Sequence, residues 1–355
     1  MGILLLAALA LMPSTTYAKQ ATRPGLPQSA GARVGPVINK ASVADLQPIH
    51  HLSGHLSDVT VVAISPDSTL IASGAADGEV RIWQSVDGEM LHKIQAHTSA
   101  VTSLAWSPDG GTLASSSNDR FVKLWDGHSG EQQKTIEARL LDYVLKVEFT
   151  PDGEYLAIAG PECLAVLRDV DTGILYKTYH QRYCLPRSGG SVYSWGIDFT
   201  PQGDEIILGF GQPGCNCGSI QKWEMDVISS NELIYGYSLP VKDLELSPDG
   251  EEIAIAMIGT SFIRLIDADS VYPLRDLTGH MFRVNSISYS PDGQLLASAS
   301  NDQRVGLWDA ASGERLRMIH EHTDAVSDLE FSPDGTYLVS ASRDDQVIIW
   351  GIPAE

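Results

Sequence analysis

Residues 280–309 read HMFRVNSISYSPDGQLLASASNDQRVGLWD, and this stretch decides the fold. Three segments within it, VNSISYS, LLASAS and VGLW, alternate apolar and polar residues as half-buried strands do. The tetrapeptide SPDG joins the first two segments. Its proline fixes φ, its aspartate can bond the turn backbone, and its glycine tolerates a positive φ. The stretch therefore predicts a three-stranded meander.

The same turn recurs along the chain. Its first residue falls at intervals of 42, 43, 50, 47, 43 and 42 residues, at Ser65, Ser107, Thr150, Thr200, Ser247, Ser290 and Ser332. A period of about 40–45 residues with four strands per unit is typical of propeller blades. The chain also carries Gly-His pairs at 54–55 and 279–280, and Trp-Asp pairs at 125–126 and 308–309. In these features, residues 46–350 resemble the WD-repeat family of β-propellers. The resemblance implies an all-β fold with seven blades.

The two ends of the repeat array complement each other. The last repeat stops at Trp350 without an outer strand, whereas residues 46–52 form a spare strand before the first repeat. Pairing the two would close the ring and remove unpaired strand edges. We therefore predict that the N-terminal strand completes the last blade.

Four repeats share a stricter polar pattern. In each, a histidine is followed after 18 residues by serine, after 22 by aspartate and after 28 by tryptophan. In the family that the chain resembles, these side chains form a hydrogen-bonded chain inside the blade. The indole donates to serine, serine donates to histidine, and histidine donates to aspartate, so every buried polar group has a partner. The sets are His55, Ser73, Asp77 and Trp83; His97, Ser115, Asp119 and Trp125; His280, Ser298, Asp302 and Trp308; and His322, Ser340, Asp344 and Trp350.

Serine, histidine and aspartate could also form a catalytic triad. However, the set occurs four times at identical spacing, and no G-x-S-x-G sequence surrounds any of the serines. Catalysis needs one site, whereas a repeated scaffold needs one set in each blade. The pattern therefore indicates a structural role, and we expect no catalytic residue and no cofactor.

Repeats three to five depart from this pattern. Their serine positions hold Ile158, Leu208 and Ile255, and their histidine positions hold Leu140, Gly190 and Tyr237. Arg168 and Leu265 replace tryptophan in repeats three and five, while Trp223 of repeat four is displaced by five residues. Because all members of the polar chain are replaced together, aliphatic packing can substitute for it.

The longest predicted loops and all four cysteines lie in this same part of the chain. The loops span residues 180–191 and 209–218, and the cysteines are Cys163, Cys184, Cys215 and Cys217. Blade topology gathers these loops at one corner. In an exported protein a disulfide is the expected state, and we favour Cys184 bridged to Cys215 or Cys217. A metal site that also uses His180, or free thiols, are the alternatives.

The net charge of −21 argues against nucleic acid or an anionic membrane surface as the main partner. Residues 1–18 resemble a secretory signal peptide, with a ten-residue apolar run too short to span a bilayer and small residues before a cleavage point at Ala18. They lack the usual Lys or Arg, so an uncleaved tether or a mispredicted start, with a cytoplasmic protein, is the alternative. Residues 19–41 are predicted to be a disordered linker, and residues 42–355 the propeller.

These features predict an exported, monomeric, non-catalytic scaffold, periplasmic or extracellular, that binds a protein or peptide through the loops of blades three to five. Tyrosine, tryptophan and arginine often dominate binding energy, and we expect contacts from Arg139, Tyr143, Arg182, Tyr183, Arg187, Tyr193 and Trp195. An acidic or aromatic peptide would complement this cluster. The rival hypotheses are a propeller enzyme or metal-binding protein that uses the cysteine corner, and a purely structural module of a larger assembly.

Overall fold

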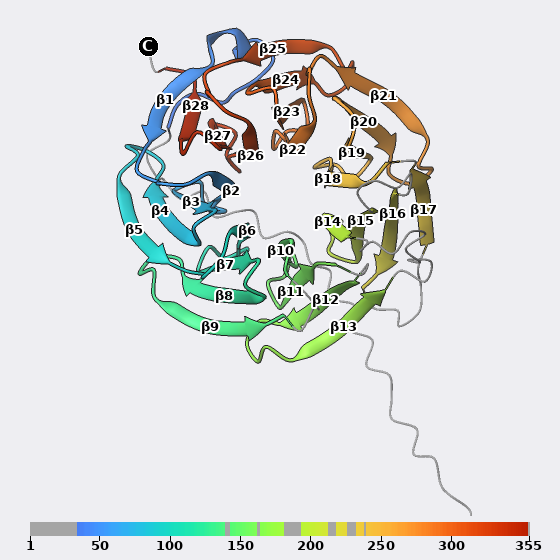
Figure 1. The fold of residues 1–355 in the computed structure, drawn as a ribbon. Coiled ribbons are helices and arrows are strands. Elements are labelled where there is room, and N and C mark those ends of the chain that lie inside the picture. Colours follow the sequence, from blue (N-terminus) through green and yellow to red (C-terminus); the bar gives the residue numbers. More distant parts are fainter. Residues whose placement is uncertain are drawn as a thin grey trace, which may run out of the picture.

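The computed structural model describes residues 34–138, 143–161, 164–180, 193–211, 218–225, 232–237 and 239–353. Seven four-stranded antiparallel sheets stand around a central axis like the blades of a propeller (Figure 1). The all-β, seven-bladed architecture predicted from the repeat is therefore confirmed. Within the described residues, no helix is both long enough and apolar enough to cross a bilayer.

Each blade has an inner strand beside the axis, two middle strands and an outer strand. The inner strands of blades one to seven are β2 (Val59–Ile64), β6 (Val101–Trp106), β10 (Lys146–Phe149), β14 (Tyr193–Phe199), β18 (Val241–Leu246), β22 (Val284–Tyr289) and β26 (Val326–Phe331). The second strands are β3 (Leu70–Ala75), β7 (Thr112–Ser117), β11 (Tyr155–Ala159), β15 (Glu205–Gly211), β19 (Glu252–Met257), β23 (Leu295–Ser300) and β27 (Tyr337–Ser342).

The third strands are β4 (Glu79–Gln84), β8 (Phe121–Asp126), β12 (Leu164–Asp169), β16 (Gly218–Glu224), β20 (Phe262–Asp267), β24 (Val305–Asp309) and β28 (Val347–Gly351). The outer strands are β5 (Met90–Gln95), β9 (Gln132–Glu137), β13 (Leu175–His180), β17 (Glu232–Tyr237), β21 (Pro273–Thr278), β25 (Arg315–Ile319) and, for blade seven, β1 (Gln47–Leu52). The predicted loop at 209–218 is shorter than expected, because β15 continues to Gly211 and pairs there with Gly218 of β16.

The antiparallel order gives the propeller two distinct faces. The turn after each inner strand and the turn after each third strand lie on one face, which we call the turn face. The connections between second and third strands, and those between blades, lie on the opposite face, which we call the loop face. The SPDG turn forms as the sequence predicts: Ser290 donates to Asp292 at 2.6 Å, and Gly293 adopts a φ of 69°.

The ring closes through the N-terminal strand. Strand β1 pairs antiparallel with β28, from Gln47 opposite Gly351 to Leu52 opposite Val347, and so completes blade seven (Figure 1). Pro48 is tolerated because β1 is the outer edge strand and the register shifts between Pro48 and His50. The predicted closure is confirmed.

The residues just before β1 form a strap, residues 34–46, that packs on blades six and seven. Ile38 is 1% exposed within the core between these blades, and its amide donates to the carbonyl of Gly335 at 2.8 Å. Lys40 pairs with Asp309 at 2.8 Å, and the single 3₁₀ helix of the described residues, Val43–Asp45, follows. The prediction of a disordered linker over 19–41 is therefore wrong for residues 34–41, since their few apolar side chains find a groove that the sequence does not reveal. Residues 19–33 lie outside the described residues, as does the predicted signal peptide.

The hydrophobic core lies between neighbouring blades. One cluster joins Val62 and Trp83 of blade one to Tyr337 and Ile349 of blade seven, and similar clusters occupy the other interfaces. The inner three strands of each sheet are mostly buried on both faces, whereas outer strands such as β5 and β9 are largely exposed, so buried polar side chains are confined to specific positions. These positions make the candidate sites below.

Candidate functional site

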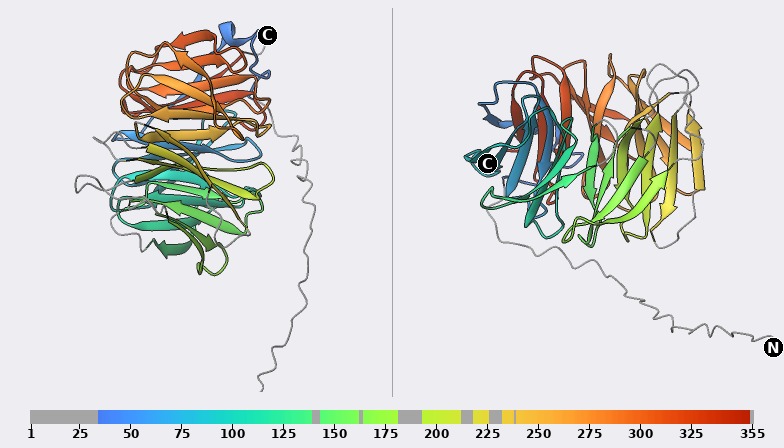
Figure 2. Two further views of the ribbon diagram at one scale, coloured as in Figure 1. Left: turned by 90° about the vertical axis from the view of Figure 1, so that its right-hand side faces the viewer. Right: turned by 60° about the horizontal axis from the view of Figure 1, so that its bottom comes forward.

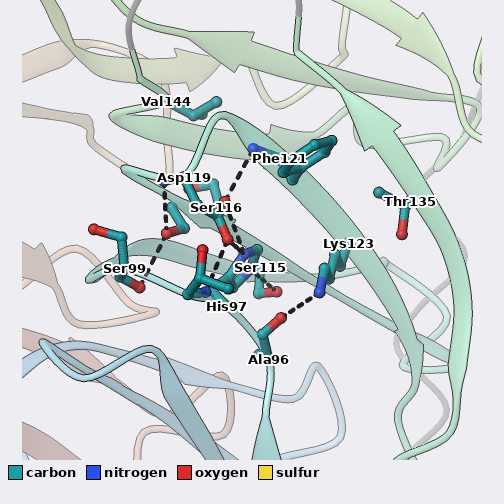
Figure 3. A network of polar contacts seen from close by, with 12 residues as sticks. Ala96, His97, Ser99, Ser115, Ser116, Asp119, Phe121, Lys123, Thr135 and Val144 are labelled. Carbon is teal, nitrogen blue, oxygen red and sulfur yellow. Dashed lines mark hydrogen bonds and ion pairs between the residues drawn. The ribbon is translucent and has the colours of Figure 1, made fainter.

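The predicted polar chain is present in blade two, and Figure 3 shows its histidine, serine and aspartate. The indole Nε1 of Trp125 donates to Ser115 Oγ at 2.8 Å, and Ser115 Oγ lies 2.8 Å from His97 Nε2. His97 Nδ1 lies 3.0 Å from Asp119. The serine accepts from the indole, so its own proton goes to Nε2, and Nδ1 is then the nitrogen that donates to the carboxylate. The histidine is thereby a neutral connector, and burial lowers its pKa below the usual value.

Blades six and seven repeat this geometry. His280 lies 2.7 Å from Ser298 and 2.9 Å from Asp302. In blade seven, the corresponding bonds join His322 to Ser340 and to Asp344. Burial opposes ionisation of Asp302, but hydrogen bonds from His280 and from the amide of Met281 outweigh it and lower the pKa of this carboxyl. Each aspartate thus ties the loop that contains the histidine to the turn between the second and third strands.

Blade one breaks the chain at its last link. His55 bonds Ser73 at 2.7 Å, but its Nδ1 has no hydrogen-bond partner among the described residues and faces Glu79 at 3.7 Å instead of Asp77. Burial and the neighbouring Arg81 lower the pKa of His55 to about 4. The predicted contact between His55 and Asp77 is therefore wrong.

A second serine explains the difference. In the three complete sets, a serine two residues before the aspartate accepts the amide N–H of that aspartate at 3.1 Å; the pairs are Ser117 with Asp119, Ser300 with Asp302, and Ser342 with Asp344. Blade one has Ala75 at this position. Without the hydroxyl, the turn is not held in the conformation that brings the carboxylate to histidine.

Blades three to five replace the chain by apolar packing. Ile158, Leu208 and Ile255 are each 0% exposed at the serine position. In blade five the tryptophan position is filled by Ile266, which pairs with Ile253 as Trp308 pairs with Leu296 in blade six. The assignment of Leu265 to that position is wrong by one residue, because the preceding turn is one residue longer. Trp223 does occupy the tryptophan position of blade four, opposite Ile206.

A β-bulge shapes the inner strand of six blades at its loop-face end. The register shifts at Thr60, Thr102, Trp195, Lys242, Asn285 and Ser327. A bulge re-aims the side chain at the extra residue. In blades one, two and six this side chain reaches the next blade: Thr60 donates to Val101 O, Thr102 to Val144 O, and Asn285 to Val326 O, each at 2.7 Å. Trp195 and Lys242 take the same position in blades four and five, and neither has such a hydrogen bond in the described structure.

The structure brings together three of the seven side chains predicted to bind a partner. The rings of Tyr143 and Tyr193 stack at 5.9 Å, and those of Tyr193 and Trp195 lie 5.0 Å apart. All three are partly exposed at the loop-face ends of blades three and four. We call them the aromatic ladder. Arg139, Arg182, Tyr183, Arg187 and the four cysteines, Cys163, Cys184, Cys215 and Cys217, lie outside the described residues; His180 ends β13.

On the turn face, the axis contains a cavity of about 480 Å³. Six acidic residues and one lysine line it, on the inner strands of blades three, four, five and seven: Lys146, Glu148, Asp198, Asp243, Glu245, Asp328 and Glu330. Several carboxylates also bind the next blade. Asp328 accepts the amide N–H of Val62 at 3.0 Å, and Glu330 accepts that of Ile64 at 3.0 Å. These side chains therefore join blades as well as line the axis.

The crowding of carboxylates changes their acidity. Burial raises the pKa of Glu148 to about 7, that of Asp198 to about 6 and that of Glu330 to about 8. Burial opposes the charge of Lys146, but the carboxylates around it, Asp243 first, outweigh that effect and raise its pKa. The described residues include no group of three His, Cys, Asp or Glu side chains placed to hold a metal ion.

Four segments of the chain match a known family of repeats. A model of the WD domain, G-beta repeat, matches residues 46–84, 88–126, 271–309 and 313–351. These segments carry the four His-Ser-Asp-Trp sets and stand within a seven-bladed propeller. The chain belongs to the WD-repeat family.

The curated relatives are WD-repeat proteins matched over part of their length. The chain is 29% identical to WD repeat-containing protein SL1-17 of Schistosoma mansoni over 48% of this chain and 52% of that protein. It is 24% identical to Periodic tryptophan protein 2 of Arabidopsis thaliana over 73% of this chain and 23% of that protein. It is 23% identical to Actin-interacting protein 1 of Drosophila melanogaster over 48% of this chain and 26% of that protein. The matches thus span about half or less of these relatives.

The family matches leave residues 127–270 uncovered, and this gap coincides with blades three to five. In this WD-repeat propeller, the segment that lost the polar chain is also the one with the aromatic ladder and Lys242. Sequence reasoning found the aromatic side chains but missed Lys242 and the acidic cavity. The signal for the cavity was the alternation Asp-Leu-Glu at 243–245 and again at 328–330, in strands whose neighbours are apolar.

Proposed function

We propose that this WD-repeat propeller is a protein-binding platform that receives its partner on the loop face of blades three to five. WD-repeat propellers are interaction scaffolds, and the name of one relative, Actin-interacting protein 1, records an interaction with a protein. The proposal assigns the partner's main contact to the aromatic ladder. It treats the acidic cavity of the turn face as part of the scaffold.

One observation carries this proposal: Trp195 stands at a bulge position that other blades use to hold their neighbour. In blades one, two and six this position carries a residue that bonds the next blade. In blade four the side chain is an indole that packs against the Tyr193 ring at a tilt and is partly exposed. Aromatic side chains at such rims supply large contact area at low conformational cost. A side chain that is hydrogen-bonded to the next blade is not available to a partner. The exposed part of the Trp195 indole has no such bond in the described structure and can contact a partner.

Four of the predicted contact residues lie outside the described structure, and only their positions in the sequence relate them to this proposal. Arg139 precedes Tyr143 in the connection between blades two and three, while Arg182, Tyr183 and Arg187 belong to the connection between blades three and four. They would extend the binding surface that the aromatic ladder begins. We retain them as part of the proposal.

We also propose that the protein is non-catalytic and exported. Its His, Ser and Asp groups recur in four blades, and the histidine and serine of each set are buried, so a substrate has no route to them. Export is supported by the apolar residues 3–12 and the small residues that precede Lys19. Mass spectrometry of the mature protein checks this part: an N-terminus at Lys19 and a disulfide that includes Cys184 are expected, and an intact residue 1–18 segment with four reduced cysteines would contradict both.

Affinity capture with matched variants tests the platform. The full chain is immobilised and exposed to the envelope fraction and culture fluid of its source, with Tyr193→Ser and Trp195→Ala beside the wild type. We expect captured protein to fall about tenfold or more in each variant, with little change for Thr98→Ala or Ser99→Ala in the corresponding connection of blade two. Tyr183→Ala and Arg187→Ala extend the test. Equal losses from the two connections would remove the proposed face, and turnover of a captured substrate would favour the enzyme hypothesis.

A further inference from the structure

The loop-face rim of blades five to seven carries three cations that have no ion-pair partner among the residues that the structure describes. They are Lys242 at the bulge of β18, Arg283 just before β22, and Arg343 in the turn between β27 and β28. Some other cations of the described residues do form ion pairs: Arg264 pairs with Asp276 at 2.7 Å and Lys222 with Glu205 at 2.6 Å. None of the three rim cations forms an ion pair within the described part of the chain. We call these three residues the cationic rim.

Arg283 is held in place by its neighbours. Its Nε donates to Asn285 Oδ1 at 3.2 Å. The amide of Asn285 is itself fixed, because Nδ2 donates to Asn301 at 2.8 Å and to Val326 O at 2.7 Å. One edge of the guanidinium is therefore anchored, while its two terminal nitrogens make no hydrogen bond within the described structure. A planar fork held in this way is suited to a carboxylate.

The positive charges of the rim affect one another. Burial and the charge of Arg343 lower the pKa of Arg283. Burial also lowers the pKa of Lys242, with Arg283 and Lys146 acting in the same direction and Asp243 opposing them. A bound anion would relieve this repulsion. Asp243 thus acts on Lys242, but no carboxylate of the described residues forms an ion pair with any of the three rim cations, although the whole chain has a net charge of −21.

Two neighbouring features define the anion further. Met281 and Phe282, which directly precede Arg283, are each 61% exposed. On the other side of Arg343 lies a group of carboxylates. Burial is the main cause that raises the pKa of Asp345, and the negative charges of Asp58, Asp344 and Asp77 raise it further. An extended polyanion would be repelled by these carboxylates, whereas a short segment with acidic and apolar residues fits between the two.

We infer that the cationic rim, together with Met281 and Phe282, binds a short acidic peptide segment of a protein partner. Carboxylates of that segment meet Arg283 and Lys242, and an apolar side chain of the segment covers Met281 or Phe282. The inference rests on the proposed function, because it takes the loop face as the side on which a protein partner approaches. It adds the charge of the segment and places its contact on blades five to seven, beside the aromatic ladder.

Fluorescence anisotropy with two labelled peptides tests the inference on the full chain. The probes are Glu-Phe-Asp-Glu-Leu-Asp amide and the same peptide with lysine at each acidic position. We expect the acidic probe alone to bind, with an affinity that falls as salt rises. Arg283→Gln and Lys242→Gln should each weaken it about tenfold, as the loss of a charge-assisted hydrogen bond does. Arg120→Gln is the matched control. Arg120 is an exposed arginine on the same face, in the turn between the second and third strands of blade two, which is equivalent to the turn of Arg343 in blade seven.

Several results would overturn the inference. One is that the acidic probe does not bind, and another is that Arg120→Gln weakens its binding as much as the rim variants do. A third is that oligo-thymidine displaces the probe at a lower concentration than the unlabelled peptide does, and that result would indicate a general polyanion site. If Arg283→Gln unfolds, Arg283→Lys and Phe282→Ser replace it, and both should weaken the probe while keeping the melting temperature. Captured partner lost in Trp195→Ala but unchanged in Arg283→Gln and Lys242→Gln would leave the proposed function standing and remove this inference.

Discussion

Blades five and six are neighbours with the same strand order, but they stabilise their cores by different chemistry. In blade six, Ser298 accepts from the indole of Trp308 and bonds His280. In blade five, Ile255 and Ile266 fill the serine and tryptophan positions and are 0% exposed. Both solutions leave no unpaired polar group at these positions, so both are compatible with the same fold.

The two solutions have different consequences for the loop face. The histidine and aspartate of the polar chain belong to its connections, so a blade with the chain has those connections fixed from within. A blade with aliphatic packing has no such tie, and its connections can change in length and composition without a cost in the core. This accounts for the position of the aromatic ladder and Lys242 in blades three to five. Loop variation here follows from core chemistry.

A polar group placed in an aliphatic blade should have the largest effect on stability. Ile255→Ser should destabilise the protein by about 4 kcal/mol, because it removes buried apolar contacts and leaves a hydroxyl without the histidine and indole that blade six provides. Ile255→Val is the control and should cost about 1 kcal/mol. Denaturant unfolding followed by tryptophan fluorescence measures both. A cost for the serine variant no larger than that of valine would show that blade five does not depend on aliphatic packing.

The converse change removes one member from a complete chain. His280→Ala should cost about 3 kcal/mol, because Ser298 and Asp302 lose their shared partner and a cavity replaces the imidazole. His320→Ala, an exposed histidine nearby, should cost less than about 0.5 kcal/mol. The same unfolding assay, combined with binding of the acidic probe, separates stability from recognition. An unchanged unfolding midpoint with lost binding would contradict the structural role of the set.

The acidic cavity should make the stability of the protein depend on pH. Burial raises the pKa of Glu330 from 4.5 to about 8. The folded state therefore holds this proton more tightly than the unfolded chain does; the resulting stabilisation is complete below pH 4.5 and is lost as the pH rises through 8. Glu330→Gln, which keeps an acceptor for the amide of Ile64, should raise stability by about 2 kcal/mol at pH 9 and change it little at pH 4.

Thermal unfolding at the two pH values measures this difference, with the exposed Glu314→Gln as control. A gain of the same size at both pH values would mean that the charge of Glu330 is not the cause. A loss at pH 9 would mean that the carboxylate is compensated by Lys146 in full.

The smallest effect on stability is expected from completing the polar chain of blade one. Ala75→Ser should supply the hydroxyl that positions Asp77 and so complete the chain of blade one, raising stability by about 0.5–1 kcal/mol. Ala76→Ser, one residue further along the same turn, is the control and should give no gain. Thermal unfolding measures both variants. Equal effects would indicate that the turn serine does not position the aspartate in this blade.

Much of this fold was predictable from local sequence, because each blade repeats one short pattern. The period of the SPDG turn predicted the blade number, and the absence of an outer strand after Trp350 predicted closure by residues 46–52. Three of the four polar sets formed as spacing predicted. The fourth failed because spacing alone does not show that the aspartate needs Ser117, Ser300 or Ser342 to hold its turn. The strap was missed because Ile38 has no apolar periodicity around it.

The candidate site was less predictable. Tyr143, Tyr193 and Trp195 were identified from residue type, yet their stacking depends on two different blades. Lys242, Arg283 and Arg343 lie 41 and 60 residues apart in sequence, and their mutual repulsion has no local signal. The cavity carboxylates were visible only as alternate residues in four separate strands.

Local sequence specifies the repeating unit of this protein, since alternation, turn chemistry and the polar sets act over a few residues to a few tens of residues. Which residues of different blades meet depends instead on how the blades pack in three dimensions. Closing the ring brings equivalent positions of seven inner strands around one axis, so side chains that are remote along the chain share one electrostatic environment. The charge and the exposed surface at each end of that axis come from all seven blades together. They therefore cannot be read from any single repeat.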